Sequence, residues 1–93
     1  MLTIIWKETA LDELAEIISF IADVNPEAAT KLHEKIKAAI LPAAEHPYLF
    51  RPGRVPGTRE VIAHANYLLV YIVGIDSIEV VAVLHARQQY PKN

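Results

Sequence analysis

The chain of 93 residues contains no cysteine. Disulfides and thiolate-bound zinc are therefore excluded, because both require cysteine sulfur. The sequence also lacks any apolar run of about 18 residues, which excludes a transmembrane helix. Its first eight residues have no basic stretch ahead of an apolar one, so they do not resemble a signal peptide. We expect a soluble cytoplasmic protein that has no contact with a membrane.

Positive charge is scarce as well. Nine Lys and Arg residues stand against eleven Asp and Glu residues, which leaves a net charge of −2. Proteins that hold nucleic acid by its phosphates usually carry a basic surplus, so we expect no direct DNA binding by the isolated chain. All four arginines, Arg51, Arg54, Arg59 and Arg87, lie in the second half. Guanidinium groups suit planar, bidentate contacts, and these four are candidate partner-binding residues.

The length and the apolar content together indicate one compact unit. Hydrophobic residues make up 53% of the chain, and 93 residues is an ordinary size for a single domain. We therefore expect residues 1–93 to form one domain. With so small a total surface, some apolar area should remain exposed, which hints at a protein partner.

Two helices joined by a short link are predicted between residues 9 and 41. Thr9 should cap the first helix, which should end at residues 23–24. Asn25 is typical of the cap of the second helix and Pro26 of its first residue, and Pro42 should stop it. A link this short requires an antiparallel hairpin. The apolar stripe of the first helix consists of Leu11, Leu14, Ile17, Ile18 and Ile21.

Four segments are predicted to be strands. They are rich in Val, Ile and Tyr and cover residues 3–6, 58–64, 67–73 and 78–85. Residues 46–57 are rich in proline and glycine, which indicates an ordered loop without regular structure. The order β-α-α-β-β-β predicts an α+β fold, in which the helical hairpin packs on one face of a small, mainly antiparallel sheet.

Polar residues with chemical potential follow the last predicted strand. In an extended segment His85 and Arg87 point the same way, and Tyr90 comes soon after. His85 could move protons on a phosphodiester while arginines hold the phosphate. The spacing alone favours a simpler interpretation, in which His85 ends the strand and Arg87 pairs with an acid such as Glu60 or Glu79.

Arg59 is interesting for function only if it shares a sheet face with Tyr67, Tyr71 and Arg87. Otherwise it is expected to form a surface ion pair, worth ~0–1 kcal/mol. Tyr48, in the proline-rich loop, is expected to pack against the helical hairpin. The four histidines lack metal-ligand spacing, and no Gly-rich phosphate loop is present. We therefore expect no metal and no other cofactor.

One ordered set of residues runs through almost the whole chain: Trp6, Leu14, Asn25-Pro26-Glu27, His46-Pro47, Arg59-Glu60, Tyr67, Tyr71 and Leu84-His85-Ala86-Arg87. In this order they resemble the ParE/RelE superfamily of bacterial type II toxin–antitoxin toxins, and the ParE branch most closely. The resemblance implies a small toxin that a cognate antitoxin neutralises by wrapping an extended or helical segment over it. ParE-like members poison DNA gyrase by trapping it on cleaved DNA. RelE-like members cut messenger RNA in the ribosomal A site with a basic cluster and a tyrosine.

The basic residues favour the gyrase branch. RelE-like nucleases resemble one another in carrying a basic residue just after the tyrosine of the third strand, but here Leu68 follows Tyr67. Only Arg59 and Arg87 remain of a basic cluster. Stabilising a pentavalent phosphate without a metal requires several fixed positive groups. We therefore expect inhibitory binding, with DNA gyrase as the target, and no catalysis.

The expected partner-binding residues are Arg51, Arg54, Arg59, Tyr67, Tyr71, His85 and Arg87. Under the nuclease alternative the ribosome is the partner, and the catalytic residues are His85, Arg87, Arg59 and Tyr90. A second alternative is a non-toxic remnant that serves only to bind an antitoxin or act as a co-repressor. An antitoxin is expected to cover the apolar stripe of the hairpin and one sheet edge, because an open edge is a template for pairing.

Overall fold

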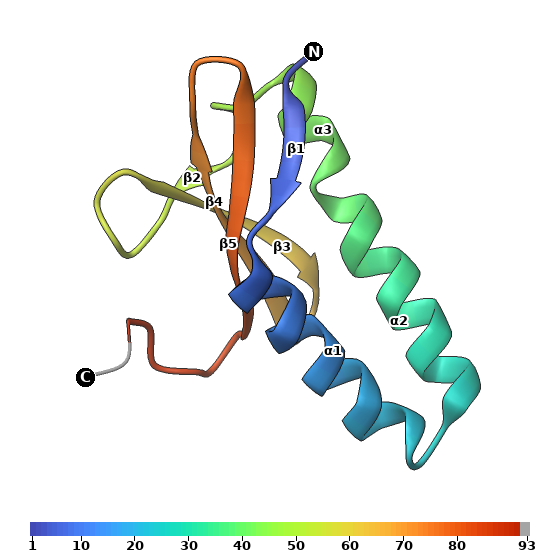
Figure 1. Cartoon of the computed structure of the whole chain (residues 1–93). Helices are drawn as coiled ribbons and strands as arrows, with labels where there is room; N and C mark the ends of the chain where they lie inside the picture. The colour runs from blue at the N-terminus through green and yellow to red at the C-terminus, as the bar shows by residue number, and fades with distance from the viewer. Residues whose placement is uncertain (92–93) are drawn as a thin grey trace.

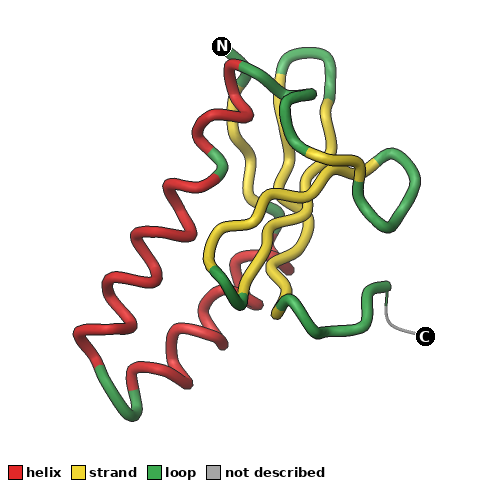
Figure 2. The backbone as a smooth tube through the Cα atoms, turned by 180° about the vertical axis from the view of Figure 1, so that it is seen from behind, coloured by secondary structure: helices red, strands yellow, loops and turns green. Residues whose placement is uncertain are grey.

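The computed structural model describes residues 1–91, which form a helical hairpin on a five-stranded sheet (Figure 1). The elements are β1 (Thr3–Trp6), α1 (Glu8–Ala22), α2 (Pro26–Ala39), α3 (Leu41–Glu45), β2 (Arg51–Pro52), β3 (Thr58–His64), β4 (Tyr67–Val73) and β5 (Ser77–His85). The predicted α+β fold is confirmed, and the predicted strand boundaries agree with the structure to within one residue. Seen from behind, the long helices stay on one side of the sheet and the C-terminal segment on the other (Figure 2).

The strand order of the sheet is β1-β5-β4-β3-β2. β1 pairs with β5 in parallel, and the other neighbouring strands are antiparallel. A parallel pair needs a crossover connection, which most of the intervening chain provides. The pairing of β1 ends where Trp6 faces Val80, although β5 continues to His85. Residues 81–85 therefore have β4 on one side and no strand on the other.

Both faces of the sheet are buried at its centre. On the helix side the core includes Leu69 and Tyr71 of β4, packed with Leu14 of α1 and Ile36 of α2. The opposite, outer face has its own buried cluster, made of Leu68, Val70, Ala82 and Leu84. Side chains alternate along a strand, so a strand buried on both faces must be apolar at almost every position. This explains the nearly unbroken apolar run of β4.

The start of the second helix agrees with the prediction. The side chain of Asn25 accepts a hydrogen bond from the Ala28 N–H at 3.0 Å, and Pro26 is the first helical residue. This satisfies one of the backbone donors that a helix N-terminus leaves without a partner. α2 ends at Ala39, and Pro42 lies in the short α3 that follows.

The predicted start of the first helix is wrong. α1 begins at Glu8 with Lys7 as its cap residue, so Thr9 lies inside the first turn. The Lys7 N–H donates to the Val80 carbonyl at 2.9 Å, while the Lys7 carbonyl accepts from the Leu11 N–H at 3.0 Å. Lys7 thus makes the last bond of the β1–β5 ladder and the first bond of the helix. Backbone pairing places the boundary here, without a capping side chain.

Three smaller expectations also need correction. Leu11, predicted to belong to the buried stripe of α1, is 40% exposed. The loop at residues 46–57 contains regular structure, because β2 pairs with β3 and the Gly53 N–H donates to the Thr58 carbonyl at 2.7 Å. α3 was not predicted either. Within residues 1–91, no helix is both long and apolar enough to span a bilayer.

Candidate functional site

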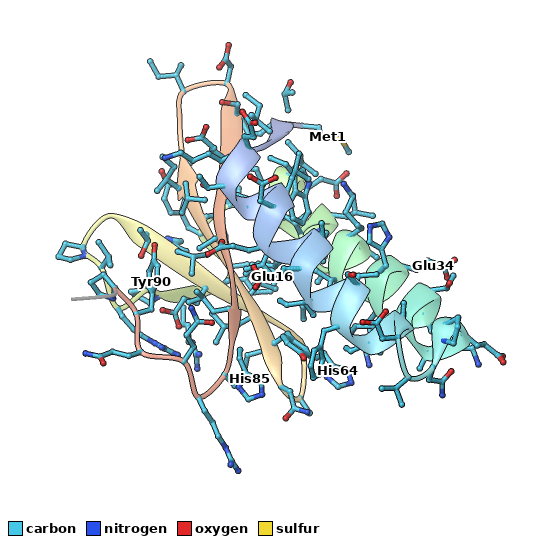
Figure 3. All side chains as sticks on the ribbon, turned by 60° about the horizontal axis from the view of Figure 1, so that its bottom comes forward. Met1, Glu16, Glu34, His64, His85 and Tyr90 are labelled. Atoms are coloured by element: carbon cyan, nitrogen blue, oxygen red, sulfur yellow. The ribbon has the colours of Figure 1, made fainter. Side chains whose placement is uncertain are left out.

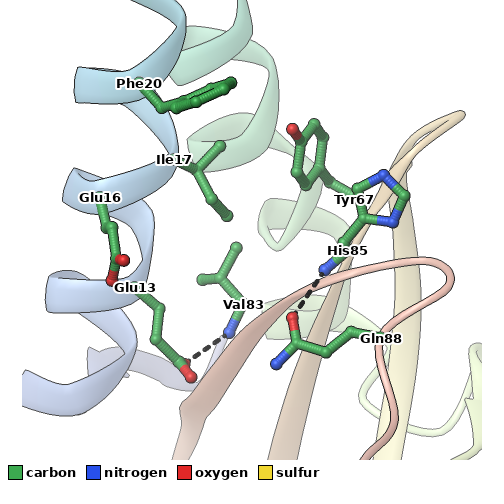
Figure 4. A pocket seen from close by; sticks show the side chains of 8 residues that line it. All are labelled: Glu13, Glu16, Ile17, Phe20, Tyr67, Val83, His85 and Gln88. Carbon is green, nitrogen blue, oxygen red and sulfur yellow. Dashed lines mark hydrogen bonds between the residues drawn. The ribbon is translucent and has the colours of Figure 1, made fainter.

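A groove of about 560 Å³ lies between α1 and the ends of β4 and β5 (Figure 4). We call it the α1–β5 groove. The helix contributes Glu13, Glu16 and Phe20 to its lining, and the sheet contributes Tyr67, Val83 and His85. These side chains come from segments far apart in the chain, and the packing of α1 on β5 brings them together.

Two carboxylates stand on the helical wall of the α1–β5 groove. Glu13 Oε1 accepts a hydrogen bond from the Val83 N–H at 3.0 Å. Glu16 follows on the same helix and is exposed. Among the described residues neither carboxylate takes part in an ion pair. The groove therefore has an acidic wall, and one of its carboxylates occupies a backbone donor of β5.

Tyr67 and His85 face each other across β4 and β5 on the sheet side of the groove. They are register partners, with ring centroids 5.4 Å apart and planes at 82°, an edge-to-face arrangement. His85 Nδ1 accepts from the Arg87 N–H at 3.1 Å, so in the neutral ring the proton is on Nε2. The His85 N–H donates to Gln88 Oε1 at 3.3 Å. The fold thus brings together Tyr67 and His85, two of the expected partner-binding residues, although their role in binding stays a prediction.

The prediction that His85 and Arg87 point the same way assumed an extended segment, and this assumption is wrong. β5 ends at His85 and the chain turns, so the backbone of Arg87 returns to the His85 ring while its side chain is exposed. Within residues 1–91, Arg87 forms no ion pair, and the expected bond to Glu60 or Glu79 is absent. The side-chain period of two applies only while the strand continues.

Arg59 shares the helix-side face with Tyr71, its register partner on β4. Its guanidinium Nη1 donates to the carbonyls of Phe50 at 2.7 Å and Tyr48 at 3.3 Å, and its Cζ lies 4.8 Å from the centroid of the Tyr48 ring. The expected surface ion pair is therefore wrong. The packing predicted for Tyr48 is also wrong, since it is 66% exposed beneath Arg59. Tyr67 lies four residues from Tyr71 on β4, which separates the two ends of this face by about 13 Å.

Tyr90 lies on the other side of the sheet. It packs against the outer cluster of Leu68, Val70, Ala82 and Leu84, whereas Glu16 and His85 lie toward the helices (Figure 3). The residues of the nuclease alternative, His85, Arg87, Arg59 and Tyr90, therefore do not converge on one point. Among residues 1–91, no three His, Asp or Glu side chains are grouped so that they could hold a metal ion.

Arg51 and Arg54 are held by an acid for which the sequence suggested no such role. Glu60 is only 3% exposed, and its carboxylate accepts from Arg51 Nη2 at 3.2 Å and from the Arg54 N–H at 2.9 Å. Arg54 Nη1 also donates to the Gln88 carbonyl at 3.1 Å. These bonds tie the loop around β2 and the C-terminal segment to the sheet. Contacts of these arginines with a partner stay a prediction.

Tyr71, another predicted partner residue, is completely buried. Its hydroxyl donates to the Pro47 carbonyl at 2.5 Å. Burial raises the pKa of Tyr71 above its usual value of 10.0, and the nearby charge of Arg59 opposes part of that rise. In this structure Tyr71 anchors the start of the proline-rich loop and presents no surface to a partner.

Comparison with known proteins decides the family. Residues 4–90 match the family described as the ParE toxin of the type II toxin–antitoxin system parDE. The chain belongs to the ParE toxin family. It is also 39% identical over 88 residues to the candidate toxin Y4kP of Sinorhizobium fredii, an alignment that covers 94% of this chain and 91% of that protein. The predicted superfamily and its ParE branch are thereby confirmed.

Solved structures show the same fold at lower sequence identity. A chain of the chromosomal ParDE toxin–antitoxin system from P. aeruginosa has a TM-score of 0.81 and 21% identity, covering 91% of this chain and 96% of that one. The YoeB/ParE toxin from Agrobacterium tumefaciens has a TM-score of 0.60 and 18% identity, covering 90% and 98%. The ParE-family chain thus shares its architecture with proteins named for both ParE and YoeB.

Proposed function

We propose that this ParE-family toxin acts by binding DNA gyrase and that it catalyses no reaction of its own. The observation that supports binding over catalysis is the dispersal of its basic and acid–base groups. His85 lies in the α1–β5 groove, Arg59 at the far end of the same face, and Tyr90 on the outer face. Stabilising the charge of a phosphoryl transition state requires fixed donors that converge on one point.

The arginines also have structural tasks that reduce their freedom for catalysis. Arg51 and Arg54 bind the buried Glu60, and Arg59 binds two backbone carbonyls. Arg87 differs, because its exposed side chain has no ion pair within the described part of the chain. We therefore propose Arg87 as the arginine most available to a protein target.

A supercoiling assay with purified toxin and purified gyrase tests this proposal. We expect loss of supercoiling and accumulation of cleaved DNA as the toxin concentration rises. Arg87→Glu should weaken the inhibition, while Lys35→Glu, an equal charge change at an exposed position of α2, should leave it unchanged. Full gyrase activity at saturating, folded toxin would refute the proposal.

The rival is ribosome-dependent cleavage of messenger RNA. It is favoured by one observation, the Tyr67–His85 pair beside the carboxylates of the α1–β5 groove, which supplies acid–base groups. No lysine or arginine among residues 1–91 lines that groove to hold a phosphate. Primer extension on ribosome-bound message separates the two functions. We expect no A-site cuts; cuts that disappear in His85→Ala would establish the nuclease.

We further infer that a cognate antitoxin neutralises this toxin in the cytoplasm, where gyrase works. Solved relatives of the fold are named as the ParDE system of P. aeruginosa and as the YoeB–YefM complex of Staphylococcus aureus, which supports such a partner. Expression of the toxin alone should arrest growth, and co-expression of its cognate antitoxin should restore growth. Unchanged growth and nucleoid shape without the antitoxin would instead indicate a non-toxic remnant.

A further inference from the structure

We propose that the α1–β5 groove receives an extended, positively charged segment of the antitoxin, added as a strand to the free half of β5. The inference rests on the proposed antitoxin binding and specifies where and by what chemistry it occurs. It depends on three features of the groove, namely an unpaired strand edge, an acidic wall and an exposed aromatic side chain.

The strand edge comes first. β1 pairs with β5 only as far as Val80, so the next five residues of β5 have no strand paired on this side, although Ala82, Val83 and Leu84 are themselves buried. Two backbone donors on this edge are occupied by side chains. The Val83 N–H donates to Glu13, and the His85 N–H donates to Gln88. These side-chain caps occupy the backbone donors and so hinder non-specific strand pairing. Unlike a paired strand, they can rotate away when a suitable partner strand binds.

The negative charge of the groove favours an incoming strand that carries basic residues. Glu13 and Glu16 form its helical wall, and no lysine or arginine of residues 1–91 lines it. When a strand takes over the Val83 N–H, the Glu13 carboxylate loses its donor and needs another. A lysine or arginine of the strand supplies a charge-assisted bond, which is stronger than the neutral one that it replaces. The same cation is within reach of Glu16, the neighbouring carboxylate on α1.

The groove also offers apolar contact to alternate residues of such a strand. Phe20 is 75% exposed at the groove, although large aromatic side chains are usually buried. Tyr67 lines the groove from the sheet side, and Ile17 of α1 and Val83 of β5 add further apolar side chains to its lining (Figure 4). An extended segment points successive side chains in opposite directions. One set can therefore meet the apolar side chains while the other carries the positive charge.

Charge argues against a second copy of this chain as the occupant. Two copies joined symmetrically through the same edge would bring both Glu13 and both Glu16 carboxylates together, and like charges repel at close range. An added strand with basic residues meets no such repulsion. The groove therefore fits a cationic partner better than it fits itself.

The test uses the full-length toxin and, as probe, the antitoxin that restores growth in the co-expression assay. Glu16→Lys should weaken binding about tenfold or more, because it places a cation where the partner carries one. Asp12→Lys is the matched control, since it makes the same charge change at an exposed position of α1 outside the groove. Glu13→Gln removes the charge but keeps an oxygen for the Val83 N–H, so it should weaken binding without unfolding the toxin.

Amide hydrogen exchange by NMR reports the strand itself. On binding, the amides of Val83 and His85 should exchange at least about tenfold more slowly, because backbone pairing replaces mobile side-chain caps. A complex in which these amides exchange as in free toxin, and in which Glu16→Lys behaves like Asp12→Lys, would overturn the inference while leaving antitoxin binding intact. If no complex forms at all, the proposed antitoxin binding is refuted, and the proposed docking site is refuted with it. A toxin that sediments alone as a dimer, with the same amides slowed, would assign the groove to a second copy and likewise overturn the inference.

Discussion

Replacing Glu60 by alanine should be among the most destabilising single changes in this chain. The carboxylate is 3% exposed and accepts from the Arg54 N–H at 2.9 Å. It also forms ion pairs with Arg51 at 3.2 Å and with Arg54 Nε at 3.5 Å. Alanine leaves the backbone donor without its charged acceptor and removes the group that holds the loop around β2 to the sheet.

The magnitude follows from the exposure of each partner. A hydrogen bond to a charged group contributes ~1.5–3 kcal/mol to stability. The side chains of Arg51 and Arg54 are 53% and 36% exposed and can return to water, so each ion pair contributes only ~0–1 kcal/mol. The expected loss in the free energy of unfolding is therefore about 2–4 kcal/mol. In a domain of this size that corresponds to a Tm lower by roughly 10–25 °C.

Urea unfolding, extrapolated linearly to water, measures the free energy of unfolding. Glu79→Ala is the matched control, because Glu79 also lies on the outer face but forms no ion pair among the described residues. It should change stability by less than about 0.5 kcal/mol. Arg54→Ala keeps the backbone N–H and should cost less than Glu60→Ala. A loss below about 1 kcal/mol for Glu60→Ala, or an equal loss for Glu79→Ala, would refute the reasoning.

Three further predictions concern single anchors of the fold. Tyr71→Phe loses the hydroxyl bond to Pro47, which should cost about 1 kcal/mol at neutral pH. Because burial raises the pKa of Tyr71 in the folded protein, wild-type stability should fall as pH rises above 10.0, and this fall should be smaller in Tyr71→Phe when denaturant unfolding is measured at each pH. Asn25→Ala should cost about 1 kcal/mol by thermal unfolding, since the Ala28 N–H loses its cap, and Asn25→Asp should retain most of the stability. Gly57→Ala should cost roughly 1–3 kcal/mol by the same measurement, because the φ of Gly57 is +86°.

The regular elements were largely predictable because local physical chemistry determines them. The run of Val, Leu, Ile and Tyr in β4 and the Asn25-Pro26 start of α2 act through neighbouring residues, and both agree with the structure. The start of α1 was not predictable in this way, because the bond from Lys7 to Val80 joins residues far apart in the sequence. β2 was missed because a segment rich in proline and glycine indicates a loop until its pairing with β3 is known.

The candidate site was predicted only on its sheet side. Tyr67 and His85 were singled out because they stand at strand ends, and they do line the groove. Glu13 and Phe20 were not singled out, because an acidic residue and an exposed apolar residue are common on any amphipathic helix and do not indicate a site. They become part of a site only when α1 packs over β5, which brings Glu13 into hydrogen-bonding distance of Val83, seventy residues away in the sequence.

The short length of β1 connects the fold to recognition. The chain leaves the sheet at Lys7 because that residue caps α1, which begins at Glu8, so the second half of β5 has no partner strand within β1. The helix that follows β1 also carries Glu13, which caps the Val83 N–H that has no partner strand. The direct passage from β1 into α1 thus has two effects. It leaves the second half of β5 without a partner strand, and it places the Glu13 side chain where it can cap the Val83 N–H. Lengthening β1 would pair that edge permanently, and the acidic groove that we propose for the antitoxin would be lost.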